Sequence, residues 1–335
     1  MRPRDETLST LRALASMAGN VARDRLLGEQ ALLNPLFVSW EINSACNLRC
    51  PYCYLHDRSY GFDDRGLSFR QMKPVFRRIK NVTEDVMLLG GEPYIHPAWD
   101  DIVDHCTDEL GLRVRCITNG TRLRYHMRTT GKLKLLSVSF DYQRAFSYPK
   151  QMIDMQRQLA AVASAFPRLR ILIILVLCAD DDTGWVVERI HELTERGYGV
   201  FVNVDRNYGR QPLDSAIVRA LRHAKRRTGR VHMTDRTLDW LADIRRPPPF
   251  CNPTLLPLLD PRARLIYPCC YYNEQNAGSL LDMDYATLLH RAAARYGRYP
   301  FEKCKGCTTT AYLDATVSVR KPVEGIRHYH TLYNR

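Results

Sequence analysis

Three cysteines lie close together in the 335-residue chain, at Cys46, Cys50 and Cys53. Their C-x3-C-x2-C spacing lets each thiolate hold one iron of a cubane 4Fe–4S cluster, which leaves the fourth iron without a protein ligand. An open coordination position is where a small molecule can bind and react. Structural zinc is the alternative, but it usually takes four ligands from two separated pairs, and the nearby His56 is not a usual partner. The spacing therefore favours an iron–sulfur cluster.

Three other segments follow this loop in order. Residues 86–93 read Val-Met-Leu-Leu-Gly-Gly-Glu-Pro, residues 116–121 read Cys-Ile-Thr-Asn-Gly-Thr, and residues 136–141 read Leu-Ser-Val-Ser-Phe-Asp. Together with the cysteine loop and the strand-like run before it, they make residues 38–209 resemble the radical S-adenosylmethionine (SAM) superfamily. The resemblance implies an α/β fold built on a partial (β/α)6 barrel related to the TIM barrel.

The resemblance also implies a cofactor site. The three thiolates would hold the reducing cluster, and SAM would chelate the open iron through its amino and carboxylate groups. Glu92 would accept a charge-assisted hydrogen bond from the amino group, while Tyr52 would border the adenine. Asn119, Ser139 and Asp141 would contact the ribose or the substrate. The residues expected to bind SAM are Tyr52, Gly90, Gly91, Glu92, Pro93, Asn119, Ser139 and Asp141.

Strand-like and helix-like segments alternate from residue 38 to residue 209, which predicts a parallel sheet with right-handed crossovers. In the strand-like runs 38–43, 136–141 and 202–205, polar residues alternate with apolar ones. One face of each strand is therefore polar. If helices cover the outer face, the polar face lines the barrel interior and favours a ligand with several hydroxyl or charged groups. A solvent-facing edge strand would produce the same alternation.

A second group of cysteines consists of Cys251, Cys269, Cys304 and Cys307. Four thiols can close either a zinc site or a second cluster, and the residues alone do not choose between them. Residues 254–269 are typical of a β-hairpin, and a C-x2-C pair follows later. This arrangement resembles the twitch domain, a shortened SPASM domain, which implies one auxiliary 4Fe–4S cluster with full protein ligation. Cys270 competes with Cys269 for one ligand position.

These motifs divide the chain into five predicted parts. Residues 1–36 form an N-terminal helical extension, and residues 37–210 form the radical SAM core. A helical bridge spans residues 211–246, the auxiliary-cluster domain spans 247–315, and a tail spans 316–335. In residues 308–335 no further motif is recognised.

Charge and composition restrict the partners and the compartment. Lysine and arginine total 49 against 36 acidic residues, an excess that favours an anionic small-molecule partner, for example a phosphorylated one. Aromatic residues do not interleave with the basic run 219–227, so nucleic acid is not an expected partner. The longest apolar stretch, 171–179, is far shorter than the roughly 20 residues that span a bilayer. Without an export signal, the eleven cysteines indicate a reduced, cytoplasmic protein.

The resemblance implies that one-electron reduction, from a flavodoxin- or ferredoxin-type donor, splits SAM into methionine and a 5′-deoxyadenosyl radical, which removes a hydrogen atom from the substrate. The auxiliary cluster can then accept an electron, giving net oxidation. Alternatively, Cys270, Tyr271 or Tyr272 returns a hydrogen atom for epimerisation, or the radical forms a C–C bond.

The predicted substrate is a sugar, aminocyclitol or nucleotide-bearing metabolite of antibiotic biosynthesis. The polar barrel interior, the basic charge balance and the lack of a peptide-recognition domain favour this class. Maturation of a ribosomal peptide is the second interpretation. A zinc-stapled protein that binds nucleic acid is the alternative from a different class.

Overall fold

A single curved sheet organises the protein, for which the computed structural model describes residues 3–28, 31–57, 64–205, 212–243, 251–272, 275–299, 301, 302, 304, 309–321 and 324. The described strands follow the order β6-β5-β4-β3-β2-β1-β7-β8-β9. They are β1 (Val38–Asn43), β2 (Asp85–Gly90), β3 (Arg113–Thr118), β4 (Leu135–Phe140), β5 (Arg170–Leu177), β6 (Gly199–Val204), β7 (Leu258–Leu259), β8 (Arg264–Ile266) and β9 (Asn276–Ser279). Strands β1 to β6 pair in parallel, β7 is parallel to β1, and β8 and β9 are antiparallel additions.

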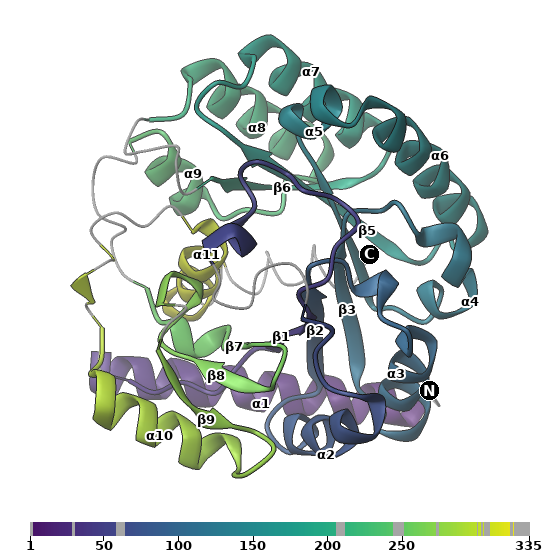
Figure 1. Cartoon of the computed structure of the whole chain (residues 1–335). Coiled ribbons are helices and arrows are strands. Elements are labelled where there is room, and N and C mark those ends of the chain that lie inside the picture. The colour runs from purple at the N-terminus through teal and green to yellow at the C-terminus, as the bar shows by residue number, and fades with distance from the viewer. Residues whose placement is uncertain are drawn as a thin grey trace.

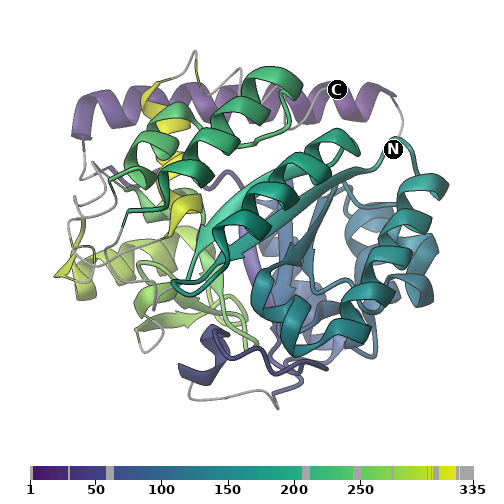
Figure 2. The ribbon, with the colours of Figure 1, turned by 90° about the horizontal axis from the view of Figure 1, so that it is seen from above.

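Helices cover the outer face of this sheet, which curves into an open half-barrel (Figure 1, Figure 2). The helices are α1 (Pro3–Leu27), α2 (Phe69–Lys80), α3 (Trp99–Asp104), α4 (Met127–Thr130), α5 (Tyr142–Ser147), α6 (Pro149–Ala165), α7 (Thr183–Glu195), α8 (Ser215–Thr228), α9 (Asp235–Leu241), α10 (Tyr285–Tyr296) and α11 (Thr310–Arg320). The described strands do not close into a full barrel, and the predicted partial (β/α)6 barrel is confirmed.

The alternating pattern of β1 explains how the sheet separates a dry side from a polar side. Val38, Trp40 and Ile42 are fully buried, and the Trp40 ring lies 4.8 Å from the Phe76 ring of the covering helix α2. Glu41 is also almost fully buried, but it points to the opposite face, as period-two alternation requires. The helices therefore exclude water from one face of the strand, and the polar residues face the interior of the half-barrel.

The predicted hairpin exists, and it extends the main sheet. Strand β7 pairs with β1, and β8 turns back antiparallel to β7. Helix α11, which the sequence motifs did not indicate, contacts both β6 and the short turn 253–255 that precedes β7. It therefore bridges the open side of the half-barrel (Figure 1) and continues across the predicted boundary between residues 315 and 316.

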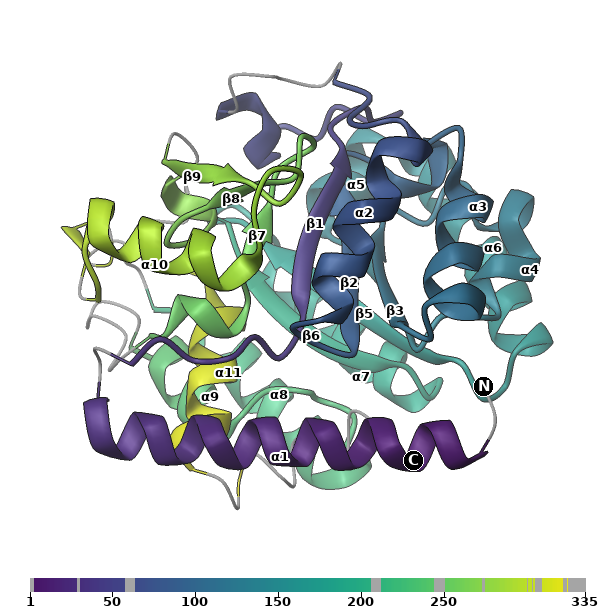
Figure 3. The same ribbon diagram turned by 90° about the horizontal axis from the view of Figure 1, so that it is seen from below.

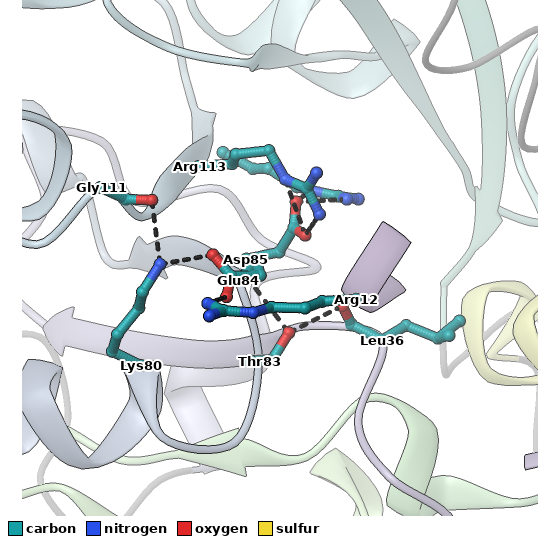
Figure 4. A network of polar contacts seen from close by, with 9 residues as sticks. Arg12, Leu36, Lys80, Thr83, Glu84, Asp85, Gly111 and Arg113 are labelled. Atoms are coloured by element: carbon teal, nitrogen blue, oxygen red, sulfur yellow. Dashed lines mark hydrogen bonds and ion pairs between the residues drawn. The ribbon is translucent and has the colours of Figure 1, made fainter. Parts of the chain in front are cut away.

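A polar network ties the amino-terminal ends of β2 and β3 to α1 (Figure 4). Arg12 donates to Glu84 at 3.1 Å, and Lys80 also pairs with Glu84. The buried carboxylate of Asp85 accepts from Arg113 at 3.0 Å and from Arg115 at 2.7 Å. Burial alone would raise the pKa of Asp85, but the two guanidinium groups outweigh it and hold that pKa below its usual value. The network stabilises the amino-terminal end of the parallel strands, opposite to the end at which the cysteine loop follows β1.

Helix α1 runs along the body of the protein as a 25-residue extension (Figure 3). Its Asn20 side chain is fully buried and bonds the Asn34 backbone in both directions, at 2.9 and 2.8 Å. Asp24 accepts from Arg320 of α11 at 3.1 Å. The helix is therefore held by specific polar contacts. In the described part of the chain, no helix combines the length and apolar character needed to cross a membrane.

Candidate active site

The cysteine loop follows β1 at the carboxyl end of the parallel strands. Cys50 is buried, and Cys46 and Cys53 are partly exposed. Burial raises the pKa of Cys46, and the nearby Glu92 and Cys50 raise it further. Burial also raises the pKa of Cys53 to about 11, again with contributions from the other two thiols. The three sulfurs thus lie within electrostatic reach of one another, where a metal would favour their thiolate forms.

Two N–H groups point at the sulfur of Cys46. Leu48 N lies 3.4 Å and Asn119 Nδ2 lies 3.8 Å from the Sγ atom. Asn119 also donates to Asn47 at 3.0 Å, so the end of β3 is fastened to the cysteine loop. Hydrogen bonds of this kind stabilise a thiolate and suit a cluster ligand.

The described residues fit a cluster in their donor chemistry. No three His, Cys, Asp or Glu side chains in the described ranges converge closely enough to hold a single metal ion. A cubane has a different requirement, because its thiolates bind separate irons. The partly exposed Cys46 and Cys53 and the N–H donors at Cys46 suit that arrangement.

The two glycines after β2 allow the cysteine loop to approach the sheet. Gly91 N donates to Asn43 O at 2.9 Å, and Glu92 N donates to Ala45 O at 2.8 Å. A Cβ atom on Gly91 would lie 2.2 Å from Ala45 O, and one on Gly90 would lie 2.0 Å from Asn43 O. Gly90 also has a φ of +147°, which L side chains rarely adopt. A larger residue at either position would push the loop away.

Glu92 is fully buried and joins the ends of β2 and β3. One of its oxygens accepts from Tyr94 N at 3.0 Å and from Thr118 Oγ1 at 2.7 Å, and the other accepts from Asn119 N at 2.7 Å. Burial raises the pKa of Glu92, although these hydrogen bonds oppose the shift. The adjacent Pro93 is buried and begins a short 3-10 turn. A carboxylate has about four acceptor positions, so Glu92 retains capacity for one more donor.

Tyr52 and Asp141 contact each other, although 89 residues separate them in the sequence. The Tyr52 hydroxyl donates to Asp141 Oδ2 at 2.6 Å, and Asp141 Oδ1 caps α5 by accepting from Arg144 N at 2.6 Å. The Arg144 guanidinium lies 3.6 Å from Asp141 Oδ2 and also donates to the Ser139 carbonyl. The sequence motifs did not indicate Arg144, whose position after the fourth strand was its only signal.

Three further carboxylates follow the next two strands. Asp180 and Asp181 come after β5, and Asp205 comes after β6. Burial raises the pKa of Asp181 to about 6, and the neighbouring Asp141, Asp180 and Asp205 add to the shift. Cys178 and Asp181 also line a cavity of about 250 Å³ that reaches the first turn of α8. The carboxyl edge of β4 to β6 is therefore acidic.

Cys251, Cys269 and Cys270 gather around a tyrosine of α11. Cys251, Cys269 and Cys270 pack against the same apolar cluster as Tyr312. Burial raises the pKa of Tyr312, the three thiols raise it further, and the Cys270 backbone donates to its hydroxyl. One turn later, Thr316 accepts from Asn252 N at 2.8 Å. Helix α11 therefore supports this group, and Tyr312 is a residue that sequence analysis missed.

The structure describes some of the remaining predicted residues fully and others only in part or not at all. Tyr272 is buried, with its ring 5.7 Å from Phe301. Tyr271 lies in a short 3-10 turn, and its side chain is not among those described. Cys304 is partly exposed, whereas Cys307 lies outside the described residues.

Part of this chain is similar in sequence to a known protein family. The model of the radical SAM superfamily matches residues 40–162. Mycofactocin maturase MftC of Mycobacterium tuberculosis is 34% identical over 103 residues, which cover 30% of this chain and 25% of MftC. AdoMet-dependent heme synthase of Methanosarcina barkeri is 32% identical over 112 residues, covering 32% of this chain and 31% of the synthase. The matched segment thus spans about a quarter to a third of these relatives.

A solved structure extends the likeness in fold. Streptococcus suis SuiB, crystallised with precursor peptide SuiA, superposes with a TM-score of 0.58 over 88% of this chain and 75% of SuiB, at 15% identity. Radical SAM proteins bind a 4Fe–4S cluster and SAM, and their SPASM-containing relatives carry auxiliary clusters. The family match coincides with the cysteine loop, the Gly-Gly-Glu-Pro turn and the residues that they contact. Residues 40–162 of this chain form a domain of the radical SAM superfamily.

Proposed function

We propose that this protein is a radical SAM enzyme that matures a peptide. The observation that carries the enzymatic part is the convergence of the thiols of Cys46, Cys50 and Cys53 with Glu92 and Asn119 at the carboxyl edge of the sheet. The carboxyl end of a parallel sheet is where barrel enzymes place their reacting groups. Thiol donors and a buried carboxylate at this edge suit an iron–sulfur cluster and the amino group of SAM.

The peptide substrate is supported by the relatives. MftC is named as a maturase, and SuiB, which shares the fold, was crystallised with a precursor peptide. The polar interior that favoured a sugar or aminocyclitol suits a peptide equally well, because each peptide unit carries one donor and one acceptor. The sugar-type substrate is therefore the weaker interpretation.

The residues have distinct roles in this proposal. Cys46, Cys50 and Cys53 hold the cluster, and Glu92 uses its remaining acceptor capacity for the SAM amino group. When bound, the cluster and SAM supply a 5′-deoxyadenosyl radical that can remove a hydrogen atom from the substrate. Asn119 orients the loop through its contacts with Asn47 and Cys46.

The second cysteine group would hold the auxiliary cluster, and that cluster would supply an acceptor or donor of one electron. Its ligands are drawn from Cys251, Cys269, Cys304 and Cys307, with Cys270 as the alternative to Cys269. A flavodoxin- or ferredoxin-type protein of the cytoplasm would supply the reducing electron.

Substrate class is tested by parallel anaerobic incubations of the reconstituted protein with SAM and a reductant. One arm receives synthetic peptides encoded by short reading frames beside the gene, and the other receives nucleotide sugars and aminocyclitols. We expect 5′-deoxyadenosine to rise above the substrate-free background only with a peptide, together with a mass change in that peptide. A rise and a product mass change only in the metabolite arm would overturn the peptide assignment.

A further inference from the structure

Arg144 is a buried cation beside the cysteine loop. Its side chain belongs to α5, which follows β4, and the residue is 5% exposed. The guanidinium donates to the Ser139 carbonyl and lies 3.6 Å from Asp141 Oδ2, the oxygen that accepts the hydroxyl of Tyr52 from the cysteine loop at 2.6 Å. Its Nε atom is buried and makes no hydrogen bond with any residue that the structure describes. The group therefore keeps an unused donor in a dry environment.

The charges around Arg144 do not cancel it completely. Asp141 is the nearest carboxylate, but its Oδ2 also accepts the Tyr52 hydroxyl and its Oδ1 caps the helix. Arg144 additionally acts on Cys53 and Glu92 through its charge. In a buried site of low effective dielectric, such interactions are several times stronger than in water.

We propose that Arg144 raises the reduction potential of the cluster held by Cys46, Cys50 and Cys53, by fixing a positive charge beside the cysteine loop. This inference rests on the cluster assigned under the proposed function. Reduction adds one electron and hence one negative charge to the cluster. A fixed cation stabilises the reduced state more than the oxidised state. Asp141 opposes the effect because it offsets part of the cation.

A purely structural role predicts a different pattern. Arg144 also fastens the end of β4 to α5 through Ser139 and Asp141. If that were its whole function, loosening the contact from either partner would disturb the site in the same way. An electrostatic role instead requires opposite effects when the cation and its neighbouring anion are removed separately.

The test is a redox titration of three variants of the full-length protein, followed by the electron paramagnetic resonance signal of the reduced cluster. All carry Cys251→Ala, so that the auxiliary site does not contribute. With titanium(III) citrate as reductant and no SAM, we expect Arg144→Gln to move the midpoint potential to a more negative value. Arg144→Lys should restore part of that shift, and Asp141→Asn should move the potential to a more positive value. Asparagine caps a helix as well as aspartate, which preserves α5.

Arg128→Gln is the matched control. Arg128 lies on α4, is exposed, and pairs with Asp104 at 2.8 Å. It should leave the potential unchanged. Shifts of the same sign in Arg144→Gln and Asp141→Asn, or no shift in either, would overturn the proposal. If Arg144→Gln fails to hold iron, the lysine and Asp141→Asn variants decide the question. A parent protein with no cluster signal would instead refute the cluster itself.

Discussion

Glu92 is a buried carboxylate whose two oxygens accept hydrogen bonds from residues at the ends of two strands. Three donors reach it, from Tyr94, Thr118 and Asn119. This arrangement explains why a glutamate follows the two glycines even before any cofactor is considered. Its ionised form is costly to bury, and the cost is offset by hydrogen bonds that also fix the ends of β2 and β3 relative to each other.

Glu92→Gln should therefore destabilise the cofactor-free protein. A glutamine places an NH2 group against at least one of the N–H or O–H donors, which leaves buried donors facing each other. We expect a loss of ~2 kcal/mol in the free energy of unfolding, measured in urea. Glu188→Gln, on an exposed side chain, is the control and should change stability by less than about 0.5 kcal/mol. Equal stability of the two variants would contradict this account of Glu92.

Asp181 should make stability depend on pH. Its pKa is about 6, against an ordinary value of 3.8, so the folded protein binds more protons than the unfolded chain between these values. Wild-type stability therefore falls as pH rises through this window. Asp181→Asn keeps an acceptor for Cys178 N but cannot ionise. After allowance for partial exposure, the variant should be ~1 kcal/mol more stable at pH 7 and no more stable at pH 4.

Urea unfolding at the two pH values measures this difference. Asp180→Asn is the matched comparison, because Asp180 is exposed and adjacent. A stability gain for Asp181→Asn that is equal at pH 4 and pH 7 would show that the gain does not arise from ionisation.

At the scale of elements, the contact between β2 and the cysteine loop depends on glycine. Gly91→Ala would bring a methyl group within 2.2 Å of a backbone oxygen, which cannot rotate away. We expect the loop to move and the protein to lose about half of its iron after reconstitution, because only the first cluster is affected. Gly19→Ala is the control, because nothing lies within 4 Å of its Cβ position in α1. It should retain full iron and gain about 0.5–1 kcal/mol of stability.

Iron per chain and thermal melting of the two glycine variants provide the measurement. Full iron content in Gly91→Ala would show that the close approach of loop and strand is dispensable. Loss of iron in both variants would point to a general effect of substitution.

The elements predicted from the sequence are those with strong local patterns. The alternation in β1 correctly separated its buried apolar face from its polar face, and the hairpin predicted within residues 254–269 is present as β7 and β8. Helix α11 was missed because residues 310–320 include four threonine or valine residues and no recognised motif. Such residues favour strands, so this helix depends on packing against β6 and α1, which local sequence does not reveal.

Site residues divide in the same way. The cysteines, glycines and Glu92 lie in short motifs and were predicted. Arg144 and Tyr312 act through contacts with residues far away in the sequence, and a single sequence read by itself carries no signal for such contacts. The pairing of Tyr52 with Asp141 was also unforeseen, although each was predicted separately.

For the whole molecule, the proposal requires two clusters, one at the cysteine loop and one at the second cysteine group. Wild-type protein reconstituted without oxygen should hold about eight irons, and Cys50→Ala and Cys251→Ala should each hold about four. Cys106→Ala is the control, since Cys106 is fully buried among apolar residues, and it should keep about eight. Iron analysis and visible absorption provide the measurement. If the wild type held about four irons and Cys251→Ala held the same number, the protein would have no second cluster.

The central claim is that the thiols of Cys46, Cys50 and Cys53 hold the cluster that cleaves SAM. Its most direct test is the release of 5′-deoxyadenosine from SAM by reduced, reconstituted protein under anaerobic conditions. We predict release by wild type and by Cys106→Ala, and none above background by Cys50→Ala. Continued release by Cys50→Ala, at the wild-type rate, would contradict the account.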